Sequence, residues 1–210
     1  MISLTRRLIF FVFVTVTPKL AVSYDNPERE TKESTIRQVS GNLLSNWDFE
    51  GATISPWEPI VDEEGAIVKK SEEHAHSGKF GLVTGRTEKG DGICQDITNM
   101  VELGVPYEGS LWAKFIDVPN DYSNYFDFKI HNRFKQKIND IDMYHDAYHL
   151  VAGCNAVLTN EWTKITGSYV YDDDDLEVVF LKLCAQGPSN TTFAIDDVSF
   201  QLTKPEANAF

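Results

Sequence analysis

Short runs of alternating apolar and polar residues recur along most of this chain, and turn-forming residues separate them. Trp162 to Tyr171 shows the clearest alternation, and Tyr125 to Ile130 shows it as well. A period of two places successive side chains on opposite faces of a β-strand. Glycine, proline, asparagine and aspartate lie between the runs, and no helical heptads are present. The pattern predicts an all-β fold, a β-sandwich of the jelly-roll type.

The alternation also predicts where the individual strands lie. Asn42–Gly51 is expected to be the first strand, with Trp47 and Phe49 on its core-facing side and Asp48 and Glu50 on the other. Residues 131–143 are polar and are expected to form a long loop. Further strands are expected at residues 65–70, 81–86, 92–98, 107–115, 125–130, 144–152, 162–171, 176–184 and 193–200.

The N-terminal residues differ in character from this pattern. Arg6 and Arg7 precede a short apolar run that ends in small residues near Ser23, which is typical of a secretory signal peptide and too short to span a membrane. The next residues are charged and poor in large apolar groups, as in disordered linkers. We therefore expect a signal peptide (1–23), a disordered linker (24–40), a β-sandwich domain (41–203) and a tail (204–210).

Charge and the expected compartment restrict the partners. The formal net charge is −13, and the expected signal peptide contributes only positive charges, so the mature chain is more acidic still. Such a charge repels nucleic acid and anionic membrane surfaces. It suits a secreted, extracellular protein, expected to be a monomer, whose ligand is neutral or whose carboxylates hold cations. Asn190 begins the one glycosylation sequon in the sequence.

Three cysteines are present, which in a secreted chain predicts one disulfide and one free thiol. The pairing cannot be read from spacing alone. Cys154 shares a face with Tyr148 if the strand expected at 144–152 continues without a bulge, and Cys184 shares a face with Phe180. If these two strands are neighbours, Cys154–Cys184 is the expected bridge, and Cys94 remains free.

Carboxylates at the two ends of the expected domain suggest a site for a hard cation. Glu50 lies beside a glycine near the start, and Asp196 and Asp197 lie near the end. If the first and last strands pair, these groups would close around one ion, and Ca²⁺ prefers such oxygen ligands. Adjacent residues point to opposite faces of a strand, so only one aspartate would reach the ion, and Asp196 is preferred.

Several motifs, taken in order, resemble a carbohydrate-binding module of the CenC type, most closely families twenty-two and four/nine. The resemblance covers about residues 42–202. The motifs are Asn42-Leu-Leu-x-Asn-x-x-Phe-Glu-Gly51 with Trp57, Ser77-Gly-Lys79, Gly85-Arg-Thr87, Gly104-x-Pro-Tyr107, Leu111-Trp-Ala-Lys114, Glu161–Tyr169 and Ile195-Asp-Asp-Val198.

This resemblance implies a jelly roll that binds polysaccharide and carries a structural calcium. The implied calcium ligands are the Glu50 side chain, a backbone carbonyl of the turn ending at Lys79, and Asp196. Tyr148 matches the family's strand tyrosine, Phe180 a later aromatic residue, and Lys182 a position held by glutamate in the family. The expected sugar-binding residues are Tyr148, Phe180, Lys182, Arg86 and Trp57, with Trp57 as the tryptophan best placed for exposure.

The sequence thus favours a secreted, non-catalytic module that recognises a cell-wall-type polysaccharide such as xylan or β-glucan. The alternative is a secreted interaction or adhesion protein that kept the jelly roll and lost sugar binding. Gly90, at the place of a family tryptophan, and Lys182 favour that alternative. A component of a glycoside hydrolase system that itself cleaves glycosidic bonds is a third hypothesis. No pair of carboxylates with catalytic character and no nucleophile motif supports it.

Overall fold

A computed structural model describes residues 41–60, 67–85, 92–117, 126–152, 158–172, 177–188 and 191–203. The expected signal peptide, linker and tail lie outside the described residues, and so do Arg86, Gly90, Cys154 and Asn190. The expectations that concern them stay predictions, except for the pairing of Cys154, which depends on Cys184.

The described residues form strands and contain no helix, which confirms the expected all-β fold. No helix among them is long and apolar enough to cross a membrane. Each of the expected strands from residue 65 onward has a counterpart. The strands are β1 (Glu58–Pro59), β2 (Ile67–Ser71), β3 (Gly81–Gly85), β4 (Ile93–Asp96), β5 (Pro106–Phe115), β6 (Asp127–Ile138), β7 (Ile141–Ala152), β8 (Thr163–Val170), β9 (Glu177–Gln186) and β10 (Thr192–Leu202).

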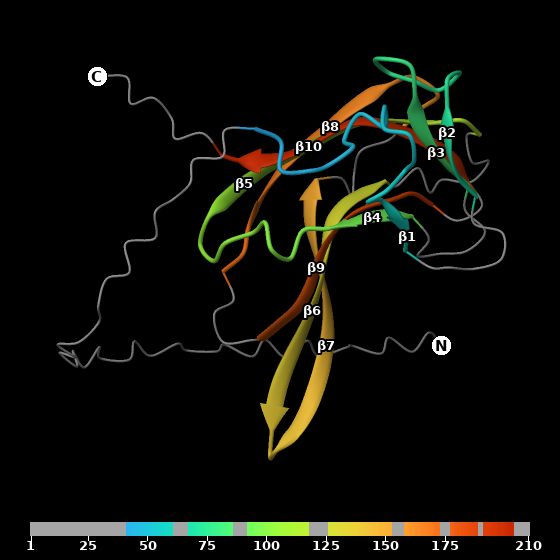
Figure 1. The fold of residues 1–210 in the computed structure, drawn as a ribbon. Coiled ribbons are helices and arrows are strands. Elements are labelled where there is room, and N and C mark those ends of the chain that lie inside the picture. Colours follow the sequence, from blue (N-terminus) through green and yellow to red (C-terminus); the bar gives the residue numbers. More distant parts are fainter. Residues whose placement is uncertain are drawn as a thin grey trace, which may run out of the picture. The chain divides into compact units, whose positions relative to one another are not determined.

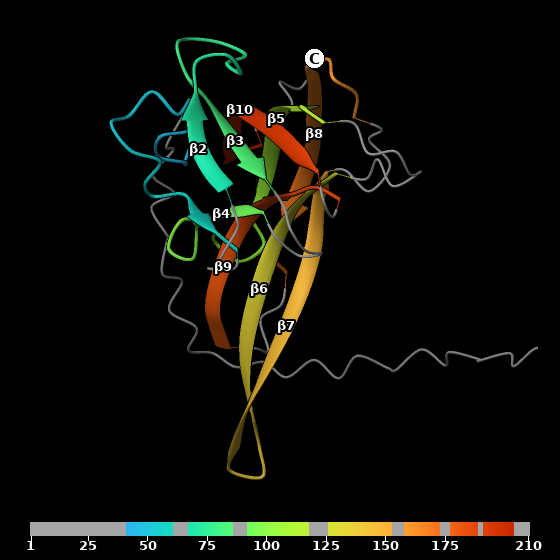
Figure 2. The same cartoon turned by 90° about the vertical axis from the view of Figure 1, so that its right-hand side faces the viewer.

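The strands form two five-stranded antiparallel sheets (Figures 1 and 2). Sheet A has the order β1-β4-β9-β6-β7, and sheet B has the order β2-β3-β10-β5-β8. Strands that are neighbours in space are rarely neighbours in sequence, as in the jelly rolls that the alternation predicted.

The core lies between the two sheets and follows from the alternation. Every second residue of β5 from Tyr107 to Phe115 is buried, and so is every second residue of β6 from Phe128 to Phe134. Aromatic rings pack side by side in this core, with Tyr107 of β5 stacked on Phe200 of the neighbouring β10 at a centroid distance of 5.2 Å. Full burial of one such side chain stabilises the fold by about 1.5–3 kcal/mol. The opposite face of each strand is thereby left for solvent or ligand.

The N-terminal stretch Asn42–Gly51 lies against the last strand, but it is not itself a strand. The Leu43 amide donates to the Phe200 carbonyl at 2.8 Å, and the Asn42 side chain bonds both Val198 O at 2.7 Å and Phe200 N at 2.9 Å. The two ends of the domain therefore lie in contact, which was the condition set for a shared cation site. The predicted strand is wrong, because Asn46 and Phe49 adopt left-handed φ values of 48° and 55°, which turn the chain back on itself.

This turn also reverses the expected roles of two tryptophans. Trp47 was expected in the core but is 40% exposed, whereas Trp57, the tryptophan considered best placed for exposure, is only 2% exposed. The Trp57 ring packs on Phe49 at 5.7 Å, and its Nε1–H donates to Asn46 O at 3.1 Å. Its indole is therefore a core group, and the prediction that Trp57 binds sugar is wrong.

The predicted loop at residues 131–143 is also wrong. β6 and β7 pair from end to end, and Asn139 and Asp140 make the turn with φ values of 50° and 64°. Two residues with positive φ form a type I′ turn, whose twist matches that of antiparallel strands. β9 pairs with β6 only as far as Lys135. The part of the hairpin nearest its turn extends beyond that point (Figures 1 and 2).

The disulfide joins Cys94 to Cys184, so the predicted Cys154–Cys184 bridge is wrong. The two cysteines are direct partners in the β4–β9 register, and their Cα atoms lie 4.1 Å apart. The prediction assumed that the strand before Cys154 is next to the strand that holds Cys184. In the structure β6 lies between β7 and β9, which separates them.

We predict that this bridge contributes substantially to stability. It spans a sequence separation of 90 residues, and closing a loop of that size in the unfolded chain is worth about 4–5 kcal/mol. Replacing both cysteines, Cys94→Ala with Cys184→Ala, should lower the free energy of unfolding in urea by that amount. Cys154→Ser is the control and should leave the bridge intact. Peptide mapping of unreduced protein that joined Cys154 to either partner would contradict the assignment.

Candidate functional site

The outer face of sheet A, which points away from the core, carries the residues with the clearest binding chemistry. On β6 the buried residues alternate with Lys129, His131 and Arg133, which share this outer face. Pairing then fixes their neighbours: His131 lies opposite Tyr148 of β7 and opposite Lys182 of β9. Three adjacent strands therefore contribute to one surface, which we call the β6 face (Lys129, His131, Arg133, Asp146, Tyr148, Phe180 and Lys182).

Aromatic rings cross the β6 face from strand to strand. The His131 ring stacks on Tyr148 at a centroid distance of 4.5 Å and meets Phe180 edge-on at 5.0 Å. Tyr148 remains 59% exposed, so its ring is available to a ligand. Exposed aromatic rings held on rigid strands are the kind of surface on which the apolar face of a sugar ring stacks.

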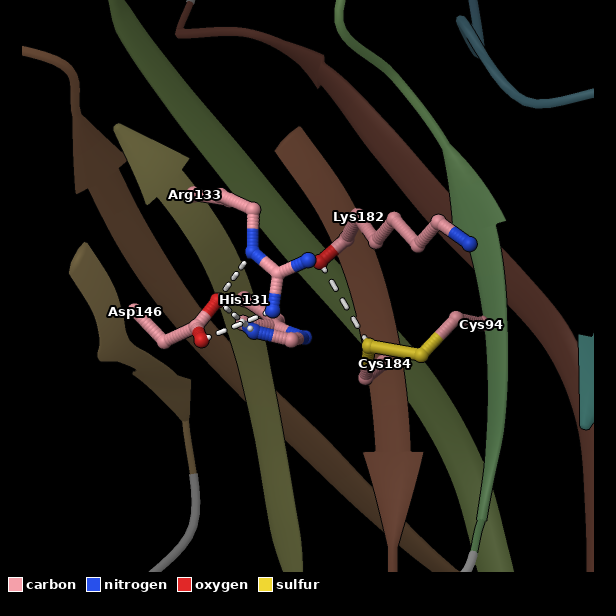
Figure 3. A network of polar contacts seen from close by, with 6 residues as sticks. All are labelled: Cys94, His131, Arg133, Asp146, Lys182 and Cys184. Carbon is pink, nitrogen blue, oxygen red and sulfur yellow. Dashed lines mark hydrogen bonds and ion pairs between the residues drawn. A yellow bond between two sulfur atoms is a disulfide. The ribbon is translucent and has the colours of Figure 1, made fainter. Parts of the chain in front are cut away.

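A charged network lies next to the rings (Figure 3). Asp146 accepts two hydrogen bonds from Arg133, from Nε to Oδ1 and from Nη2 to Oδ2, each at 2.9 Å. The same carboxylate contacts His131 Nε2 at 3.1 Å. The hydrogen bond from Arg133 is the main cause that lowers the pKa of Asp146 to about 2. Asp146 is thus ionised at neutral pH and holds both Arg133 and His131 in place.

Two lysines and the disulfide border this network. Lys182 Nζ lies 5.5 Å from the centre of the Phe180 ring and 3.7 Å from the Glu58 carboxylate. Lys129 Nζ lies 4.8 Å from the Tyr148 ring and bonds the Gln186 side chain. The Cys94–Cys184 bridge ties β4 to β9 on the same side, as Figure 3 shows.

The β6 face suits binding better than catalysis. A general acid needs a carboxyl group whose pKa is raised towards neutrality. Asp146 shows the opposite shift because Arg133 stabilises its charged form. What the face offers is stacking surface together with fixed, planar hydrogen-bonding groups.

Sequence reasoning found part of this face. The strand order brings together Tyr148, Phe180 and Lys182, which were expected to act together, whereas Trp57 is buried elsewhere. His131 and Arg133 were missed because residues 131–143 were interpreted as a loop. Asp146 lies in an expected strand, but it was missed because its partners His131 and Arg133 were placed in that loop. The signal was present, since Lys129, His131, Arg133, Lys135 and Lys137 recur at a spacing of two, as the outer residues of a strand do.

The expected calcium ligands meet at a different place, the turn of residues 76–80. Glu50 Oε1 accepts the backbone N–H groups of Lys79 at 2.7 Å and Phe80 at 2.8 Å, and these bonds lower the pKa of Glu50. Gly78 has a φ of 60°, and a Cβ there would lie 2.5 Å from Glu50 Oε1. Glycine at this position therefore allows the carboxylate to approach the turn.

Asp196 and Asp197 hold the other half of the turn. Asp196 Oδ2 accepts the N–H groups of His76 at 2.8 Å and Ser77 at 3.1 Å, and burial raises the pKa of this carboxyl. Asp197 contacts His76 Nδ1 and Ser77 Oγ, both at 2.7 Å. The His76 ring in turn stacks on Trp112 at 4.0 Å. Both aspartates therefore contact His76 and Ser77, and the prediction that they point to opposite faces is wrong. Asp197 has a left-handed φ of 48° at an irregularity of β10, which breaks the strand alternation.

The turn fits an oxygen-binding cation only in part. Glu50 and Asp196 offer carboxylate oxygens to one turn, which suits Ca²⁺. Within the described ranges, however, no group of three or more acidic, histidine or cysteine side chains gathers around a common point. Moreover, the Phe80 N–H points at Glu50, so in a trans peptide the Lys79 carbonyl points away from it.

The comparisons with known proteins agree with this architecture. A family model described as a carbohydrate binding domain matches residues 41–191. Endo-1,4-beta-xylanase A of Thermoanaerobacterium saccharolyticum is 30% identical over 160 residues, which is 76% of this chain and 12% of that protein. Endo-1,4-beta-xylanase C of Paenibacillus barcinonensis is 24% identical over 168 residues, 79% of this chain and 14% of that protein. The chain thus spans a small part of these relatives.

Solved structures share the fold. The CBM22-1 xylan-binding domain of Paenibacillus barcinonensis Xyn10C has a TM-score of 0.56 at 24% identity, covering 79% of this chain and 97% of that domain. The CBM22-2 xylan-binding domain of the same protein has a TM-score of 0.60 at 18% identity, covering 74% and 97%. At these identities the likeness shows the jelly-roll fold.

We predict that Arg133 controls the titration of Asp146. Arg133→Gln should raise the pKa of Asp146 from about 2 towards its ordinary value near 3.9, as followed by NMR of the carboxyl carbon. In the native chain the pKa is depressed in the folded state, so the contribution of Asp146 to stability is present above pH ~4 and is lost as pH falls towards 2. The variant should lack that part of the acid dependence.

Lys137→Gln is the matched control. Lys137 lies on the same strand and pairs with Asp140, whose side chain is 97% exposed, at 3.5 Å. This variant should leave the Asp146 titration unchanged. An Asp146 pKa near 3.9 in the native protein would contradict the geometry described above.

Proposed function

The chain belongs to the carbohydrate-binding domain family, and from this premise we propose that it binds a cell-wall-type polysaccharide on the β6 face without cleaving it. The observation that carries the proposal is the run of rings formed by Tyr148, His131 and Phe180. These residues come from three adjacent strands, so a ligand that follows them lies across the strands.

The dimensions of the face support a polymeric ligand. Neighbouring strands lie about 4.8 Å apart, so β7 and β9, with β6 between them, span about 10 Å. A surface of that width accommodates more than one sugar ring. Arg133 and Asp146 lie beside the rings and offer donors and acceptors for hydroxyl groups.

The relatives indicate which polysaccharide to test first. Two structural neighbours are described as xylan-binding domains, and two sequence relatives as endo-1,4-beta-xylanases. Xylan is therefore the first candidate ligand and β-glucan the second. Secretion belongs to the same proposal and is supported by the disulfide, since such bridges persist in oxidising compartments.

A second candidate function is adhesion or protein interaction without sugar binding. Lys182 favours it, because this lysine stands where the resembled family has a glutamate, and its ammonium faces Glu58 at 3.7 Å. Where the resembled family offers a glutamate carboxylate to a ligand, this chain has a lysine that is paired with Glu58. Retention on insoluble polysaccharides separates the two functions.

We predict that Tyr148→Ala weakens xylan binding about tenfold, which corresponds to the ~1.4 kcal/mol expected from one stacked ring. Isothermal titration with soluble xylan measures the loss. Tyr144→Ala is the matched control, because Tyr144 lies on the same strand and face and is 58% exposed against 59% for Tyr148. Tyr144 lies opposite Lys135, away from His131, so its variant should bind normally.

Two outcomes would count against the proposal. Equal losses in both tyrosine variants would move the site away from His131. A folded native protein that is retained on none of xylan, β-glucan, cellulose or chitin would favour the second function.

We also propose that Ca²⁺ binds at the turn of residues 76–80 and supports the fold. Glu50 and Asp196 would hold it, because these two residues are far apart in sequence but both direct their carboxylates at this turn. The remaining ligands would be carbonyl oxygens and water, which Ca²⁺ accepts readily. The charge of the ion would offset the cost of burying Asp196.

We predict that Ca²⁺ raises the melting temperature of chelator-treated protein, since a ligand that binds only the folded state stabilises it. At a Ca²⁺ concentration 100 times its dissociation constant, the gain is about 2.7 kcal/mol. Glu50→Gln should abolish this response, whereas Glu58→Gln should keep it. An unchanged melting temperature with and without Ca²⁺ would remove calcium from the proposal.

A further inference from the structure

β7 is an edge strand whose residues 141–150 are largely exposed on both faces, whereas Val151 and Ala152 at its end are buried. Within the described part of the chain it is hydrogen-bonded only to β6. From Ile141 to Leu150 every residue is exposed except Ala147, which is half-buried. Large apolar and aromatic side chains are among them, including Ile141 at 63% and Tyr144 at 58%. A long exposed edge of this composition is a template for pairing with another strand.

The other edges of the two described sheets are protected in ways that β7 is not. β1 is two residues long and ends in Pro59, β2 carries Lys69 and Lys70, and β8 carries Lys164. Short length, proline and lysine are the usual devices that block edge-to-edge pairing. β7 is twelve residues long and contains no lysine, arginine or proline.

The hairpin turn determines which backbone groups of β7 are free. Ile138 and Ile141 pair across the two-residue turn, and such a closing pair is hydrogen-bonded. The odd-numbered residues of β7 therefore bond β6, and the even-numbered ones direct their N–H and C=O groups outward. Tyr144, Asp146 and Tyr148 thus present backbone donors and acceptors at the edge.

The acidic residues of β7 do not prevent pairing, because β6 neutralises them. Lys135 Nζ lies 3.2 Å from Asp142, and Arg133 forms two hydrogen bonds to Asp146. The edge itself therefore presents mainly aromatic and apolar groups. In a second copy of β7, Asp142 and Asp146 are paired in the same way. Two such strands can therefore meet without bringing together unpaired charges.

We propose that a second copy of this chain pairs with β7 in antiparallel orientation, about a two-fold axis that passes through Ala147. Asp146 then lies opposite Tyr148 of the partner subunit, and Tyr144 lies opposite Leu150 of the partner subunit. The backbone N–H and C=O groups of these residues point away from β6, so the two residues of each pair can hydrogen-bond to each other. The smallest side chain of the exposed segment lies at the axis, where the strands approach most closely.

Electrostatic repulsion favours this register over one in which the axis passes through Asp146. An axis through Asp146 would place two carboxylates directly opposite each other, which is destabilising. With Ala147 at the axis, no two carboxylates face each other, and His145 lies opposite His149 of the partner subunit.

The pairing joins sheet A of both copies into one continuous sheet. Residues opposite each other in an antiparallel pair point to the same side, so the two β6 faces lie on one side of that sheet. If the β6 face binds polysaccharide as proposed, one long chain can then engage both copies and gain avidity. The dimer itself does not depend on sugar binding and can be tested without a ligand.

Sedimentation equilibrium of the full chain over a range of concentrations tests the dimer. We expect a reversible dimer for the native protein and a monomer for Tyr144→Pro, which removes an outward N–H and keeps the ladder to β6. Tyr144→Phe is the matched control and should still form the dimer. Circular dichroism shows whether the proline variant is folded. A native protein that remains monomeric throughout overturns the proposal.

Cross-linking tests the register independently of that variant. In a Cys154→Ser background, Ala147→Cys should form an intersubunit disulfide, because residue 147 faces itself across the axis. His149→Cys, on the same strand and face, should not, because it lies opposite His145 of the partner subunit. Cross-linking through His149→Cys alone, or a dimer that survives Tyr144→Pro, overturns the proposed pairing. Loss of xylan binding without loss of the dimer would instead count against the proposed function alone.

Discussion

The candidate site depends on one strand, β6, and on its being hydrogen-bonded along both edges. Pairing with β9 on one side and β7 on the other fixes the rotation of β6 about its axis. Every second residue from Phe128 to Phe134 is consequently buried, and the residues between them must face outward. His131 therefore meets Tyr148 and Phe180, although the three residues are far apart in sequence. Without β7 and β9 on either side, the outer side chains of β6 would lack the Tyr148 and Phe180 rings that complete one binding surface.

Alternation in hydrophobicity predicted most clearly the strands that have one buried face, whereas β3 and β4 were recognised as short runs between turn residues. The run from Trp162 to Tyr171 is a case of clear alternation and corresponds to β8. The hairpin around Asn139 was missed, since the polar Asn132 occupies a buried position where an apolar residue is expected, and beyond Lys135 the residues of β6 are exposed on both faces. Trp57 was misplaced because its burial follows from a left-handed turn at Phe49. The residue types alone do not reveal that backbone conformation. The disulfide was mispaired because strand order is a property of the assembled sheets.

The acidic character of the chain has a structural use that charge counting does not reveal. Around residues 76–80, Glu50 and Asp196 accept backbone N–H groups that the tight turn leaves without partners in a strand ladder. Asp196 is fully buried, and burial without a bound cation would raise the energy of its charged form, which its raised pKa reflects. Three backbone N–H groups offset part of that cost. The same carboxylates that suggested a metal site thus also serve as acceptors that connect the two ends of the domain.

The internal pairing of charge on the β6 face narrows the chemistry of its ligand. Arg133 is bound to Asp146, Lys182 faces Glu58, and Lys135 faces Asp142, so each of these cations has a nearby carboxylate. An anionic ligand would have to compete with those carboxylates and would approach a chain of formal charge −13. A neutral polymer meets neither obstacle, and the guanidinium of Arg133 keeps N–H donors beyond the two that Asp146 uses. Stacking on Tyr148 with hydrogen bonding to this preassembled pair therefore favours an uncharged polysaccharide over an acidic one.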